Sequence, residues 1–287
     1  AISMESIYYV MTWLCHRTCV HCYEDRFRPY YGDELAAVVA ESTANMPRII
    51  DHFPEGMTFE DSGEKPGMII LAGGEILLEA VREPVLYEGI ERIRGRYGRK
   101  VRVIVQTTGD LLTPRIAGEL KVLGVDKVAI SGIDSFHAGL ETVEAQQALM
   151  QKCAKILEDA GHDAHFFGAT PDQWIGKLWP RGRAWKNGLS TANLADNFCN
   201  QWSGGLNFLE TRKKGGEVSV DPQGNVYPCC IKTRLPLGNL LEQPLEEILA
   251  GKRGNPIYEA ISAGDPSRMG LEHGWSVERF LEKSRVG

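Results

Sequence analysis

Three cysteines near the start of the chain have a spacing that favours an iron–sulfur cluster. Cys15, Cys19 and Cys22 stand in the run Cys-His-Arg-Thr-Cys-Val-His-Cys, directly after the apolar segment Ile7–Trp13. That segment has the pattern of a buried strand, so the thiolates would share one loop at its carboxyl end, where α/β sheets place their chemistry. Three thiolates bind three irons of a [4Fe–4S] cluster and leave the fourth iron without a protein ligand. The open iron is the feature that predicts function.

The alternative is that these thiols bind zinc. Structural zinc normally takes four protein ligands, so His16 or His21 would have to complete the tetrahedron within a very short segment. Such a site is cramped, and the sequence favours the iron–sulfur cluster.

Strand-like and helix-like segments alternate through about residue 170. Buried strands are expected at Ile7–Trp13, Met68–Ala72, Val101–Val105, Lys127–Ser131 and Ala164–Gly168. Helical spacing lies between them, at Leu35–His52, Ala80–Arg96, Pro114–Leu123 and Leu140–Ala160. Thr113 is expected to cap the helix that Pro114 begins, and Gly124 is placed to end it. This order predicts an α/β fold with a parallel sheet.

The alternation stops after Thr170. A turn signal at 222–224 separates two short strand-like runs, Val218–Asp221 and Asn225–Tyr227, and Leu245–Ala250 has the pattern of a short helix. We therefore expect a main domain at residues 1–185 and a smaller C-terminal region at residues 186–287.

The cysteine run resembles the signature of the radical S-adenosylmethionine (SAM) superfamily, Cys-x-x-x-Cys-x-x-Cys after the first strand. The resemblance implies a partial (β/α)6 TIM-like barrel. Gly73, Gly74 and Glu75 follow the second expected strand as the family's Gly-Gly-Glu motif does, and in relatives that turn contacts the amino group of SAM. His21 stands where relatives usually have an aromatic residue against the SAM adenine, and it still offers a flat ring. The alternative for the glycines is an ordinary turn.

Three further residues are implied to bind the cofactor by their places in the same pattern. Thr107 follows the third expected strand and Ser131 ends the fourth, where relatives supply ribose or methionine contacts. Arg183, in the run Pro-Arg-Gly-Arg-Ala, matches a stretch of related enzymes and would suit bidentate binding of a carboxylate. Structural turns and an exposed loop arginine are the alternatives.

The resemblance also implies the reaction. In the family the open iron chelates SAM, one electron from the reduced cluster breaks a C–S bond, and the resulting 5′-deoxyadenosyl radical abstracts a hydrogen atom from the substrate. The protein positions the reactants and excludes water and oxygen. A flavodoxin- or ferredoxin-type reductant is the expected electron donor.

A second group of cysteines resembles the SPASM and twitch extensions of this superfamily. Cys199 and the hairpin that ends in Pro-Cys229-Cys230 imply one auxiliary [4Fe–4S] cluster. No cysteine follows Cys230, unlike in most relatives, so Cys153 or His273 is a candidate fourth ligand. We expect Cys199 and Cys229 to ligate and Cys230 to remain a free thiol. The alternatives are that the two adjacent cysteines exchange roles or that all three ligate. Cys153 is expected to be a buried core residue.

The overall composition limits the partners. Thirty-two basic and thirty-eight acidic residues give a formal charge of −6, which disfavours nucleic acid and favours a cationic substrate. No apolar run is long enough to cross a membrane and no signal peptide is recognised at the start, so a cytoplasmic protein is expected.

The expected reaction is epimerisation of a small molecule. Only fourteen residues precede Cys15, which favours a small substrate over a peptide bound through a leader domain. The chain is similar to the aminoglycoside radical SAM enzymes, such as neomycin C epimerase, in which a thiol returns hydrogen to the opposite face of the substrate radical. Cys230 suits that role. The alternatives are a twitch-type dehydrogenase of an amino sugar, a peptide-modifying SPASM enzyme, and a non-catalytic metal protein.

Overall fold

An eight-stranded sheet forms the centre of the computed structural model, which describes residues 4–57, 66–166, 181–189, 216–228, 235–255 and 258. The strands have the spatial order β5-β4-β3-β2-β1-β6-β7-β8. Their bounds are Ser6–Val10 (β1), Met68–Ala72 (β2), Arg102–Thr107 (β3), Lys127–Ile130 (β4), Asp163–Phe166 (β5), Glu217–Val220 (β6), Asn225–Tyr227 (β7) and Gly238–Asn239 (β8). Strands β1 to β5 are parallel, as expected, and β6 pairs in parallel with the free edge of β1.

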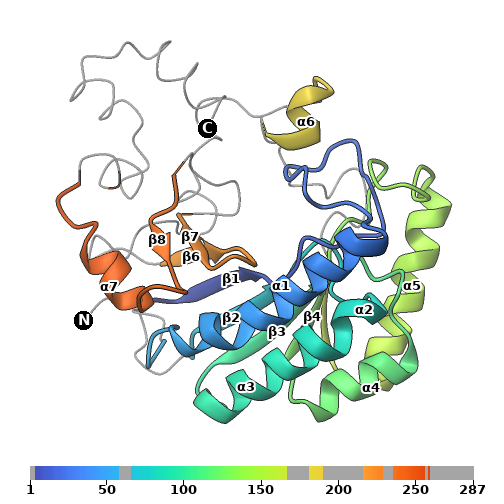
Figure 1. Ribbon diagram of the computed structural model, residues 1–287. Coiled ribbons are helices and arrows are strands. Elements are labelled where there is room, and N and C mark those ends of the chain that lie inside the picture. Colours follow the sequence, from blue (N-terminus) through green and yellow to red (C-terminus); the bar gives the residue numbers. More distant parts are fainter. Residues whose placement is uncertain are drawn as a thin grey trace.

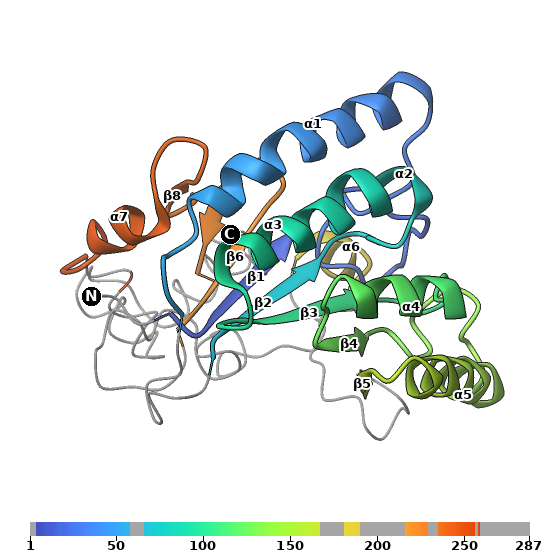
Figure 2. The ribbon, with the colours of Figure 1, turned by 90° about the horizontal axis from the view of Figure 1, so that it is seen from below.

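Helices cover one face of this sheet. Figures 1 and 2 show α1 (Gly32–Asp51), α3 (Glu88–Tyr97), α4 (Pro114–Val122) and α5 (Val143–Asp159) following the strands around the outside of the sheet. The strand residues beneath them are branched and fully buried, among them Ile69, Val103 and Val128. Burial of such near-continuous apolar strands is typical of a parallel sheet, and it leaves the carboxyl ends of the strands to carry the polar loops.

One predicted helix is interrupted. The segment expected as a single helix at Ala80–Arg96 consists of a short α2 (Glu79–Val81), a π-helical turn at Arg82–Tyr87, and α3. Pro84 lies in the π-helical turn, and a proline has no N–H to donate to the preceding turn. The predicted segment is thus helical throughout, with a π-helical turn that the sequence pattern did not predict.

Other boundaries follow their capping residues. The Thr113 hydroxyl accepts a hydrogen bond from the backbone N–H of Ile116 at the start of α4, which confirms the predicted cap, and Gly124 follows that helix with a φ of 91°. Helix α5 begins at Val143 rather than Leu140, because Thr142 accepts from the N–H of Ala145 in the same way.

The C-terminal hairpin belongs to the same sheet. The backbone N–H groups of Gln223 and Asn225 both donate to the Asp221 carboxylate, which fixes the predicted turn between β6 and β7. Helix α7 (Leu245–Ala250) follows, and Leu245 donates to the carbonyl of His52 beyond α1. The domain boundary at 185–186 stays a prediction. Within the described residues, no helix is both long enough and apolar enough to cross a membrane.

Candidate functional site

The loop after β1 carries the three cysteines at the carboxyl end of the sheet, as predicted. The Cys15 N–H donates to the Arg28 carbonyl at 3.0 Å, and the Cys22 N–H donates to the Cys19 carbonyl at 3.2 Å. All three thiols are free, and Cys15 is buried. The loop is thus closed on itself by backbone hydrogen bonds.

The spacing of the thiols suits a cluster better than a single ion. In the described part of the chain, the Sγ atoms of Cys15, Cys19 and Cys22 do not all lie within 4.8 Å of one another. Thiolates on one tetrahedral zinc would lie about 3.8 Å apart, given a Zn–S bond of about 2.3 Å. In a [4Fe–4S] cluster each thiolate binds a different iron, so a wider arrangement is needed.

The surroundings of the thiols require a cationic partner for their thiolate forms. Burial raises the pKa of the Cys22 thiol to about 11 and also raises the pKa of Cys19. Metal ligation needs the deprotonated form; Arg183 favours it at both thiols, and the positive charge of bound iron would favour it further.

The turn Gly73-Gly74 packs directly on the cysteine loop. The Gly74 N–H donates to the Thr12 carbonyl at 3.1 Å, and the Glu75 N–H donates to the Leu14 carbonyl at 2.8 Å. A Cβ at position 74 would lie 2.3 Å from the Leu14 oxygen and 2.8 Å from the Cys15 Cβ. Only glycine permits this approach, so the motif positions the first cysteine whatever else it binds.

Gly74→Ala is expected to lower the free energy of unfolding by about 1–3 kcal/mol, because backbone must move to admit the methyl group. It should also speed loss of iron from the cysteine loop. Gly118→Ala is the matched control: Gly118 lies inside α4 with no atom within 4 Å of the added Cβ, so this change should stabilise by about 0.5–1 kcal/mol. Chemical denaturation and chelator-driven iron release measure both effects. Equal behaviour of the two variants would contradict the packing role.

Glu75 joins the second loop to the third. Its buried carboxylate accepts hydrogen bonds from the N–H of Leu77, from the N–H of Thr108, and from the hydroxyls of Thr107 and Thr108, at 2.7–2.9 Å. Thr107 is itself buried. Both predicted cofactor residues therefore have a structural role within the protein, and their contact with SAM stays a prediction.

Asp110 joins the third loop to the cysteine loop. Its Oδ2 lies 2.6 Å from His16 Nε2 and 2.8 Å from Arg17 Nη2, and its Oδ1 lies at hydrogen-bond distance from the Thr108 hydroxyl, whose one proton it shares with Glu75. Burial opposes the charge on Asp110, yet the hydrogen bonds with His16 and Thr108 hold its pKa well below the usual range. The hydrogen bond with Asp110 in turn raises the pKa of His16 to about 10. A hydrogen bond with the Cys15 side chain also raises this pKa, so His16 links Asp110 to the first cysteine of the loop.

Arg183 is distant from the cysteine loop in the sequence but forms several hydrogen bonds with it. Its guanidinium donates to the carbonyls of Cys19, Asp25 and Phe27, at 2.8, 3.2 and 2.9 Å. Its backbone N–H donates to the Cys22 carbonyl at 2.8 Å. Arg183 is the second residue of the short helix α6 (Gly182–Lys186), which lies beside the cysteine loop in Figure 1. The alternative of an unengaged loop arginine is wrong, and binding of a cofactor carboxylate by Arg183 stays a prediction.

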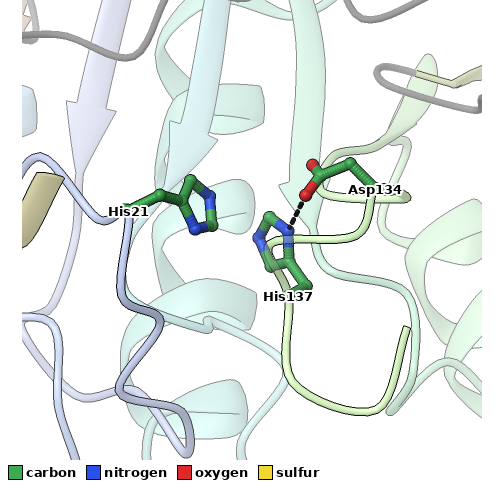
Figure 3. Close-up of side chains that lie close together, drawn as sticks. All are labelled: His21, Asp134 and His137. Atoms are coloured by element: carbon green, nitrogen blue, oxygen red, sulfur yellow. Dashed lines mark hydrogen bonds and ion pairs between the residues drawn. The ribbon is translucent and has the colours of Figure 1, made fainter. Parts of the chain in front are cut away.

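His21 meets two residues from the loop after β4 (Figure 3). Its ring centroid lies 4.5 Å from that of His137 and 5.4 Å from that of Phe136. His137 Nδ1 lies 3.0 Å from Asp134 Oδ1, which also accepts the Phe136 N–H. Ser131 lies just before this loop, and its hydroxyl is 3.4 Å from the Thr107 carbonyl. The flat ring of His21 is thus already in contact with protein groups.

The second cysteine group falls mainly outside the described residues. Cys199, Cys229 and Cys230 lie there, as does the candidate ligand His273. Cys153 is fully buried in α5, as predicted, and its thiol donates to the Gly109 carbonyl at 3.4 Å.

Four residues of the site were missed by sequence reasoning. Asp110 and Asp134 follow strands β3 and β4, His137 lies three residues beyond Asp134, and Arg17 lies inside the cysteine run. Their common signal is a position just past the carboxyl end of a predicted strand. That signal was applied only to residues that match a known motif.

Comparisons with known proteins agree with this arrangement. Residues 213–269 match the family model SPASM, described as an iron–sulfur cluster-binding domain. The structure of BtrN in complex with AdoMet and 2-DOIA is 17% identical and has a TM-score of 0.50, covering 98% of this chain and 92% of that one. The structure of anSMEcpe with bound AdoMet and the Cp18Cys peptide is 14% identical with a TM-score of 0.50, covering 91% and 83%.

The chain has the radical SAM fold. The predicted α/β barrel class and the predicted SPASM-like extension are both confirmed. No curated protein matches the sequence. At these identities the structural likeness establishes the fold alone, and in that fold the cysteine loop lies at the carboxyl end of β1.

Proposed function

We propose that the chain is a radical SAM enzyme in which Cys15, Cys19 and Cys22 hold a [4Fe–4S] cluster that binds SAM. The observation that carries this proposal is the free three-thiol loop at the carboxyl end of β1, in a chain with the radical SAM fold. When bound, the cluster and SAM supply a 5′-deoxyadenosyl radical that removes a hydrogen atom from the substrate. AdoMet in the BtrN and anSMEcpe structures supports the assignment of SAM.

The chain's own residues would bind and orient SAM. Arg17 donates one N–H group to Asp110, whereas its Nη1 is buried and has no hydrogen-bond partner in the described part of the chain. A buried donor without a partner is costly, and a carboxylate is the group that best satisfies a guanidinium. We therefore add Arg17 as a partner for the SAM carboxylate. Contacts from His21, Gly73, Gly74, Thr107, Ser131 and Arg183 remain part of the proposal.

The SPASM match supports an auxiliary [4Fe–4S] cluster in the C-terminal region. The matched residues 213–269 include Cys229 and Cys230, and Cys199 precedes them. We propose Cys199 and Cys229 as ligands and Cys230 as the thiol that returns hydrogen to the substrate. The substrate is then an amino sugar or a related cationic small molecule, favoured by the net charge of −6. A cytoplasmic location and a flavodoxin- or ferredoxin-type reductant complete the proposal.

Cleavage of SAM tests the function without knowledge of the substrate. Protein reconstituted with iron and sulfide under anaerobic conditions, and reduced with dithionite, should convert SAM to 5′-deoxyadenosine and methionine. Liquid chromatography with mass detection measures both products. A fully loaded protein that leaves SAM intact would be a non-catalytic metal protein, and the proposal would fail.

A further inference from the structure

We propose that His21, Asp134 and His137 form a second metal site, for a divalent transition-metal ion such as Zn²⁺ or Fe²⁺. The site joins the cysteine loop after β1 to the loop after β4 (Figure 3). It is distinct from the three thiols, and it shares only His21 with the residues proposed to contact SAM.

The three side chains already converge. One ligand atom from each lies within 4.8 Å of the other two. Ligands on a tetrahedral ion with metal–nitrogen bonds of about 2.0–2.1 Å are about 3.3 Å apart. Side-chain adjustments on the order of 1 Å would therefore bring these atoms to bonding distance. Figure 3 shows the rings of His21 and His137 turned toward each other, with Asp134 on the side of His137 that faces away from His21.

Asp134 provides an independent sign of a missing cation. Its side chain is 3% exposed, and its Oδ2 is buried with no hydrogen-bond partner among the described residues. The other oxygen, Oδ1, accepts from the Phe136 N–H and lies 3.0 Å from His137 Nδ1. A buried carboxylate with one oxygen unsatisfied is costly unless a positive charge compensates it. A bound cation would supply that charge at Oδ2, the oxygen that lacks a hydrogen-bond partner among the described residues.

The donor set defines the kind of metal. Two imidazoles and one carboxylate suit zinc and ferrous iron and leave positions open for water or another ligand. Hard ions such as Mg²⁺ and Ca²⁺ prefer oxygen ligands and fit poorly. A histidine binds a metal through a lone pair in the plane of the ring, so coordination would leave the faces of His21 for its contact with Phe136.

Zinc binding to the cluster-loaded protein tests the site. Reconstituted protein is incubated with Zn²⁺, passed through a desalting column and analysed for zinc and iron. We expect one zinc ion per chain with no loss of iron. Asp134→Asn and His137→Gln should each weaken zinc binding by at least about 100-fold, since loss of even an outer-shell partner costs 10–100-fold. His165→Gln, which changes an exposed histidine on β5, should bind like wild type.

X-ray absorption at the zinc edge identifies the zinc ligands in the wild-type protein, so its result does not depend on whether the variants fold. The site predicts only nitrogen and oxygen neighbours, at about 2.0–2.2 Å. Sulfur at about 2.3 Å would show that zinc occupies cysteine thiolates and would overturn the proposal. Retention of no zinc by the loaded wild type, or equal binding by all variants, would overturn it as well. None of these outcomes depends on SAM cleavage, so the radical SAM assignment is tested separately.

Discussion

Replacing Cys22 with alanine is expected to lower the rate of SAM cleavage by at least about 1000-fold, the scale on which loss of one member of a catalytic unit appears. Only three thiolates are available on the loop, and a cube held by two of them exposes a second iron. The measurement is 5′-deoxyadenosine formed by anaerobically reconstituted protein with dithionite. Cys15→Ala and Cys19→Ala should behave alike.

The same variants locate the auxiliary cluster. If the region around Cys229 holds its own [4Fe–4S] cluster, the Cys22→Ala protein should keep about four irons per chain. Cys153→Ser is the control, because serine is close in shape to this buried cysteine and still carries a donor for the Gly109 carbonyl. It should cleave SAM at close to the wild-type rate. Cleavage at the wild-type rate by Cys22→Ala would refute the triad assignment, and the absence of iron–sulfur absorbance from that variant would remove the auxiliary cluster.

Replacing Cys230 with alanine is expected to separate SAM cleavage from product formation. An S–H bond is weaker than a sugar C–H bond, so a thiol on the face opposite the deoxyadenosyl group can quench the carbon radical with inversion. The thiyl radical then needs one electron and one proton, and the proposed auxiliary cluster would pass on the electron from the reductant. Without the thiol, SAM should still be cleaved while epimer formation falls below detection.

Solvent deuterium gives the matching result for the wild type. The thiol exchanges its hydrogen with D₂O, so the epimer should gain one deuterium at the inverted carbon, while 5′-deoxyadenosine takes its hydrogen from the substrate. Mass spectrometry and NMR of the product measure both labels. Normal epimerisation by Cys230→Ala would contradict the account. A product two hydrogens lighter than the substrate, with no deuterium, would instead identify the dehydrogenase.

Local patterns predicted the elements well where one principle governs them. Strand β2 lies at Met68–Ala72 as expected, because a short apolar run that contains β-branched residues and is flanked by glycines favours a strand. The Thr113 cap was predicted because a threonine directly before a proline is a local signal for the start of a helix. The π-helical turn that contains Pro84 was not predicted, because apolar residues at helical spacing continue across it. The turn accommodates the proline, and the segment stays helical.

Contacts between residues that are distant in the sequence could not be predicted from local sequence patterns. The motif residues of the cysteine loop were found from spacing alone, but Arg183 reaches Cys19 across 164 positions and Asp110 reaches His16 across 94. The edge pairing of β6 with β1 is similarly remote in sequence. Hydrophobic periodicity states which face of an element is buried and carries no information about which charged side chains will meet. Those partners emerge only once the loops are brought together at one end of the sheet.

The most direct test of the central claim is the electron paramagnetic resonance spectrum of the reduced protein with isotopically labelled SAM. Chelation at the iron left open by Cys15, Cys19 and Cys22 predicts that SAM shifts the cluster signal. It also predicts hyperfine coupling to ¹⁷O in the SAM carboxylate and to ¹⁵N in its amino group. A reduced cluster whose signal is unchanged by saturating SAM, and which shows no coupling to either label, would contradict the assignment of this loop as the SAM-binding site.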